Sequence, residues 1–179
     1  MRILTLIFAI LAVSVTPLNQ IDEKDVNHTI ENENDSLAVE YNIYKNNADS
    51  VLQSEKTKMT GQMLADAWLE TKTNYGVDVP VSLALAQAKL ESSYCNSKLS
   101  IQKNNPYSLR GSKGYKKFET LSDGVSAYYK LMATRYLSCK NVEQLLKNFV
   151  SCAGYRYAGS RDYEHTIKKE ISIINQKIQ

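Results

Sequence analysis

The strongest candidate for chemistry in this 179-residue sequence is Glu91, which ends a long apolar run. The residues from Val81 to Leu90 are nearly all apolar, and Pro80 precedes them at a first-turn position that tolerates proline. They predict a buried helix with Glu91 in its last turn. The helix dipole and apolar surroundings both disfavour a carboxylate there and so raise its pKa. A carboxyl group that keeps its proton near neutral pH could act as a general acid. The alternative is a surface glutamate at a frayed helix end.

The elements around this helix are also predicted to be mainly helical. Apolar residues recur at helical spacing over residues 60–75, 122–136, 141–150 and 162–178. Residues 95–120 lack that period and contain Pro106, Gly111 and Gly114, which mark turns. We therefore expect a mainly α domain with five helices around one core, and a short loop or β-hairpin lobe beside them.

The N-terminal third of the chain differs from the rest. Residues 1–16 hold one arginine and then an apolar run, which predicts a secretory signal peptide, with an uncleaved anchor as the alternative. No later run is long enough to span a membrane, so no stable span is expected after cleavage. Residues 17–57 are acidic, with few apolar residues, and predict a disordered spacer. Residues 58–179 are expected to fold alone.

The predicted domain is basic. Residues 58–179 carry 18 Lys and Arg against 10 Asp and Glu, a net charge of +8. Such a charge favours a polyanionic partner, and export argues against nucleic acid and for anionic polymers of a cell wall. A merely solvated basic surface is the alternative. We expect a monomer.

The sequence contains three cysteines and two histidines. At most one internal disulfide can form, and Cys139 with Cys152 is the favoured pair because the two flank one short predicted helix. Three free buried thiols are the alternative. Two histidines make no metal-ligand cluster, so neither a metal nor another cofactor is expected.

Three segments together resemble the glucosaminidase family of peptidoglycan hydrolases. They are "YGVDVPVSLALAQAKLESSYCNSKLSIQKNNPYSLRG", "KKFETLSDGVSAYYKLM" and "YAGSRDYEHTIKKEI", in this order and at suitable separations within residues 58–175. The positions of the first segment that match are Tyr75, Gly76, Pro80, Ala86, Gln87, Glu91, Ser92, Ser97, Leu99, Asn104, Asn105 and Tyr107.

The resemblance implies a lysozyme-like, mainly helical fold with Glu91 as the general acid. It implies that Tyr157 lies across the cleft, where it holds the sugar or steadies developing charge. It also implies that Asn105 and Tyr107 bind substrate at the cleft floor. The family often carries a second carboxylate on a hairpin, but here that stretch is shortened to "SLRGSKGYKK" and contains no acid. Glu119 and Asp123 are the next candidates; otherwise the acetamido group of the substrate could attack instead.

The sequence thus predicts a secreted or periplasmic hydrolase of the cell envelope, an endo-β-N-acetylglucosaminidase that cleaves peptidoglycan glycan strands. A lytic transglycosylase or a muramidase on the same fold is the first alternative, and a non-catalytic wall-binding module is another. A cysteine peptidase or amidase is disfavoured, because Cys95 follows the C-terminal end of its helix, where a thiolate is not stabilised.

Overall fold

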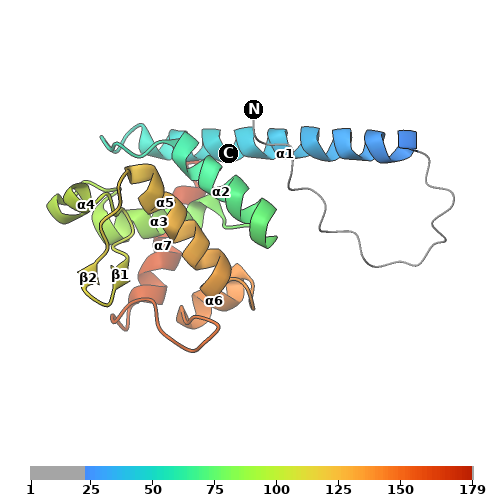
Figure 1. Ribbon diagram of the computed structural model, residues 1–179. Helices are drawn as coiled ribbons and strands as arrows, with labels where there is room; N and C mark the ends of the chain where they lie inside the picture. Colours follow the sequence, from blue (N-terminus) through green and yellow to red (C-terminus); the bar gives the residue numbers. More distant parts are fainter. Residues whose placement is uncertain (1–22, 179) are drawn as a thin grey trace. The chain divides into compact units, whose positions relative to one another are not determined.

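The computed structural model describes residues 23–178, with side chains described from residue 33 onward. The predicted signal peptide, residues 1–16, lies outside the described residues. The chain divides into two compact units, residues 1–37 and residues 38–179. Helix α1 (Glu23–Leu52) spans the boundary, and the remaining elements belong to the second unit (Figure 1). The predicted mainly α fold with a short hairpin is confirmed.

Helix α3 (Val81–Ser92) is the central element of the second unit. Its residues from Val81 to Ala88 are all buried, as the apolar sequence predicted. It packs against α7 (Tyr163–Asn175), while α2 (Gly61–Tyr75) packs against α5 (Leu121–Leu131). Helix α2 ends at Gly76, which adopts the left-handed conformation. The three alanines of α3 leave room for neighbouring helices on every side.

The C-terminal half of α1 is part of the folded unit, contrary to prediction. Tyr44, Ala48, Val51 and Leu52 form one helical face and are buried. The Tyr44 ring stacks on Trp68 with centroids 5.0 Å apart, and its hydroxyl donates to the carbonyl of Val79 over 2.9 Å. The expectation of a disordered spacer over residues 17–57 is therefore wrong for residues 38–52.

The lobe beside α3 consists of α4 (Lys98–Lys103) and a hairpin of β1 (Arg110–Gly111) and β2 (Gly114–Tyr115) (Figure 1). The strands are antiparallel, with Arg110 opposite Tyr115. The buried amide of Asn105 closes this lobe: Oδ1 accepts from the Leu109 amide, and Nδ2 donates to the carbonyls of Leu109 and Lys116. All three bonds are 2.8–3.0 Å long.

Helix α5 passes directly into a π-helical turn, η1 (Met132–Tyr136). The amide of Leu137 donates to the carbonyl of Met132 over 2.8 Å, five residues back, so the turn holds one residue more than an α-helical turn. Arg135 and Tyr136 are the last two residues of this turn. Helix α6 (Val142–Asn148) follows and begins with a capping box of Asn141 and Gln144.

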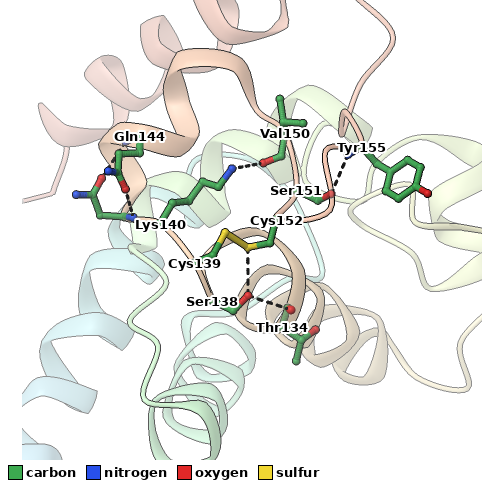
Figure 2. The surroundings of a disulfide bond; sticks show 10 residues. Thr134, Ser138, Cys139, Lys140, Gln144, Val150, Ser151, Cys152 and Tyr155 are labelled. Carbon is green, nitrogen blue, oxygen red and sulfur yellow. Dashed lines mark hydrogen bonds between the residues drawn. A yellow bond between two sulfur atoms is a disulfide. The ribbon is translucent and has the colours of Figure 1, made fainter.

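A disulfide joins Cys139 to Cys152, the pair that the sequence favoured, and encloses α6 (Figure 2). The amide of Cys152 also donates to the carbonyl of Arg135 over 2.7 Å. These links fasten the loop between α6 and α7 to the end of η1. Tyr157 belongs to this loop, and its amide donates to the carbonyl of Phe149.

Candidate active site

Glu91 lies in the last turn of α3 and is partly buried. The hydroxyl of Ser108 donates to its backbone carbonyl over 3.0 Å, and the hydroxyl of Tyr163 donates to its side-chain Oε1 over 3.3 Å. Burial raises the pKa of the Glu91 carboxyl; the hydrogen bond from Tyr163 and the charge of Arg110 oppose part of that rise. The result is a carboxyl group with an enhanced tendency to stay protonated.

Two cavities meet at Glu91. Glu91, Ser108 and Tyr115 border both cavities, which have volumes of about 520 Å³ and about 140 Å³. The larger is also lined by Tyr107, Leu109, Arg110, Leu131, Arg135, Tyr136, Tyr157, Ala158 and Gly159. The smaller is also lined by Ser97, Leu99, Ser100, Lys103 and Asn105. The carboxyl group therefore stands between two adjoining hollows, an arrangement suited to an extended ligand that passes over it.

Two tyrosines flank the carboxyl group from the C-terminal part of the chain. The rings of Tyr157 and Tyr163 stack with centroids 5.8 Å apart, and the Tyr157 hydroxyl donates to the carbonyl of Tyr107 over 3.3 Å. Burial raises the pKa of both phenols, so both remain neutral donors. Tyr157 lines the larger cavity, where the sequence predicted it, but the hydrogen bond to Glu91 comes from Tyr163.

A family model described as mannosyl-glycoprotein endo-beta-N-acetylglucosaminidase, the glucosaminidase family, matches residues 63–176. The chain belongs to the glucosaminidase family. It is therefore a glycoside hydrolase in the general sense, with a glycan as its substrate. A search of curated proteins found no match. The matched residues include every residue that lines either cavity, but α1 lies outside them.

The two predicted substrate-binding residues of the protein have other contacts. The Asn105 amide is 2% exposed, and both of its donors and its oxygen are already bonded within the lobe. Tyr107 is 1% exposed and stacks on Tyr128 with centroids 3.6 Å apart. Asn105 therefore fixes the hairpin, and Tyr107 supports the cleft floor from within the core. Each also borders one of the cavities, and its contact with substrate stays a prediction.

Neither candidate for a second carboxylate lies at the site. The Asp123 carboxylate accepts hydrogen bonds from the amide and the hydroxyl of Thr120, and thus caps α5. Glu119 is exposed and borders neither cavity. Among the described residues, Glu91 is the one acid that lines either cavity. The prediction that Asp123 or Glu119 serves as a base is therefore corrected by their positions.

The remaining thiol of the protein, Cys95, is buried, and burial raises its pKa, which disfavours the nucleophilic thiolate. It borders neither cavity. Within residues 33–178, no cluster of His, Cys, Asp and Glu could hold a metal ion. None of the described helices is long and apolar enough to cross a membrane.

Tyr163 was not predicted as a site residue, because it falls within the stretch 162–178, whose helical spacing of apolar residues indicates packing. A signal was present: the closing segment that resembles the family contains two tyrosines, Tyr157 and Tyr163, six residues apart. Gln87, four residues before Glu91, was noted as a match but given no role. Residues four apart in a helix share a face, so this spacing already placed its amide beside the carboxyl group.

Proposed function

We propose that the protein is a secreted endo-β-N-acetylglucosaminidase that cleaves the glycan strands of peptidoglycan, with Glu91 as the general acid. One observation carries the proposal: the only acid lining the cavities of the described residues is a carboxyl group with a raised pKa at the point where both cavities meet. A polymer laid through both hollows would present a glycosidic oxygen to this group.

A single carboxyl group is sufficient when the substrate supplies the nucleophile. Glu91 gives its proton to the glycosidic oxygen, and the bond from that oxygen to the sugar C1 breaks. The carbonyl oxygen of the 2-acetamido group of the same sugar attacks C1 and forms an oxazolinium ion, which keeps the amide proton. Water then attacks C1, opens the ring and returns a proton to the Glu91 carboxylate. Substrate assistance of this kind is an established exception to the scheme with two carboxylates.

The charge of the cavities favours a glycan that carries carboxylates. Arg110 and Arg135 line the larger cavity and Lys103 lines the smaller one. None of these three side chains forms an ion pair within residues 33–178. Peptidoglycan carries carboxylates on its peptides, whereas chitin, a neutral polymer of N-acetylglucosamine, carries none. We therefore propose peptidoglycan as the substrate and anionic wall polymers as secondary partners.

Export is proposed from two features. The apolar run of residues 1–16 has the composition of a signal peptide. The disulfide between Cys139 and Cys152 suits an oxidising compartment outside the cytosol. N-terminal sequencing of the protein recovered from the medium or periplasm tests this: an intact Met1 on protein retained in cells would contradict it.

The decisive experiment is digestion of purified peptidoglycan, followed by borohydride reduction and mass spectrometry of the soluble products. Reduced N-acetylglucosamine ends support the proposal. Anhydro-muramyl ends would identify a lytic transglycosylase, and reduced N-acetylmuramic acid ends a muramidase. Pelleting with the wall without soluble products would identify a binding module. Glu119→Gln is the matched control for Glu91→Gln, because it makes the same change outside the cavities.

A further inference from the structure

The hydrogen bond from Tyr163 to Glu91 is the last of a buried series of three. Gln87 lies on α3 four residues before Glu91 and is fully buried. Its Nε2 donates to the Tyr163 hydroxyl over 3.0 Å, and its Oε1 accepts from the Tyr128 hydroxyl over 2.5 Å. The series therefore runs from α5 through α3 to α7 and returns to α3 at the carboxyl group.

The direction of the series follows from counting protons. A tyrosine hydroxyl has one proton, and a carbonyl-type amide oxygen can only accept. Tyr128 gives its proton to Gln87, which fixes the amide with its NH2 toward Tyr163. The Tyr163 oxygen accepts from that NH2, so its one proton is available for Glu91.

The opposite orientation of the amide is unfavourable. A flipped Gln87 would present Nε2 to Tyr128 and Oε1 to Tyr163. The Tyr128 proton would then lose its acceptor in a fully buried position, between the rings of Tyr107 and Tyr129. Tyr163 would turn its proton toward Gln87 and away from Glu91. A buried donor without an acceptor is costly, so Tyr128 selects the orientation observed.

We propose that Gln87 and Tyr128 are positioning residues: they direct the hydroxyl proton of Tyr163 onto Oε1 of Glu91 and so leave Oε2 as the oxygen that carries the transferable proton. Oε2 receives no hydrogen bond from the described residues, which keeps it available for the substrate. The catalytic meaning of this inference rests on the proposed function. The orientation itself can be measured without activity.

The test is the titration of the Glu91 carboxyl carbon by ¹³C NMR in the full protein and its variants. Tyr163→Phe should raise the pKa of Glu91 by about 0.5 to 1, because it removes a hydrogen bond to the carboxylate. Tyr128→Phe should raise it in the same direction, because the freed amide can flip and take the Tyr163 proton. The pKa of Glu91 in the variant that carries both Tyr128→Phe and Tyr163→Phe should equal that in Tyr163→Phe alone.

Tyr129→Phe is the matched control. Tyr129 neighbours Tyr128 and is equally buried, but its hydroxyl bonds to that of Tyr44. It should lower the thermal stability while leaving the Glu91 titration unchanged. The other charged or titratable groups near Glu91 stay in place in every variant: Arg110 from β1, Tyr157 from the loop before α7 and Arg135 from η1.

An unchanged Glu91 titration in Tyr128→Phe, beside a raised pKa in Tyr163→Phe, would overturn the inference. Should Tyr128→Phe not fold, Gln87→Met tests the series with a side chain of similar length. It removes the NH2 that fixes the Tyr163 hydroxyl without offering a competing acceptor, so the pKa of Glu91 should rise by less than in Tyr163→Phe, and an unchanged pKa would overturn the inference. If the wild-type protein releases no glycan fragments, the proposed function fails while the titration still tests the series. In an active protein, the basic limb of the pH profile of kcat should shift to higher pH in the variants that raise the pKa of Glu91.

Discussion

Val51→Ala tests whether α1 belongs to the folded unit. Val51 is fully buried on the face of α1 that packs within the second unit, whereas Val39, on the same helix, is 59% exposed. The same substitution can therefore be made at both positions. If residues 17–57 were a disordered spacer, the two variants would behave alike.

The magnitude follows from the groups removed. Val51→Ala deletes two methyl groups, about 1.6 kcal/mol of burial at ~0.8 kcal/mol each. A residual cavity of roughly 40 Å³ adds about 1 kcal/mol. Alanine's better helix propensity returns about 0.5 kcal/mol at either position. The free energy of unfolding should thus fall by about 2 kcal/mol for Val51→Ala and rise slightly for Val39→Ala.

Urea unfolding at 25 °C, followed by tryptophan fluorescence and by circular dichroism, measures both values. Trp68 is a direct reporter because its ring stacks on Tyr44 of α1. The melting temperatures of the two variants should differ by about 5 to 10 °C, since 1 kcal/mol corresponds to roughly 2–4 °C for a chain of this size. Equal midpoints for the two variants would refute the placement of α1.

The remaining predictions concern the site. Glu91→Gln should lower kcat by about 100- to 10,000-fold while Glu119→Gln leaves it near the wild-type value, as measured by release of soluble glycan. Because burial raises the pKa of Glu91 in the folded state, ionisation destabilises the fold as pH rises through that pKa; Glu91→Gln should therefore gain melting temperature over the wild type at pH 8 and not at pH 4. Reduction of the Cys139–Cys152 disulfide should cost about 3 kcal/mol of stability and raise KM, because the Tyr157 loop loosens; the double serine variant should not respond to reductant. Arg135→Gln should weaken binding to peptidoglycan at low salt and leave binding to chitin oligosaccharides unchanged, and equal losses on both substrates would count against a role for its charge.

Local sequence patterns were sufficient to predict the elements whose structure depends on residues close to one another in the chain. Helix α3 has apolar residues on every face, and such a helix is stable only at the centre of a hydrophobic core. The Asn141–Gln144 capping box depends on two residues that are three apart in the chain. The pairing of Cys139 with Cys152 depends on the one short helix between them. Each of these depends on neighbours in the chain, so each could be predicted.

Helix α1 could not be predicted in the same way because its signal is diluted. Tyr44, Ala48, Val51 and Leu52 have the spacing of a helical face, but asparagine and acidic residues surround them in the sequence. Averaged composition therefore indicated disorder. The helix is stabilised by partners distant in sequence, such as Trp68 and the carbonyl of Val79, which no local window contains.

The roles of polar site residues were the least predictable part. Glu91 was identified from its helix alone, but Asn105, Asp123 and Tyr163 each have a role that depends on its hydrogen-bond partners. A carboxylate three residues after a threonine caps a helix or serves a cleft according to where its oxygens point. The sequence does not show which of these roles a side chain takes, because its hydrogen-bond partner can be far away in the chain. Tyr163 and Glu91, for example, are 72 residues apart.

The π turn at Met132–Tyr136 has a consequence for how this cleft can change by insertion and deletion. One residue removed from that turn would restore regular helical hydrogen bonding and rotate everything after it by about 100°. Arg135 and Tyr136 would leave the cavity wall, and Cys139 would turn away from Cys152. The buried face of α5, which precedes the turn, would be untouched. A single-codon deletion could thus remodel one wall of the cleft while the helical core keeps its packing.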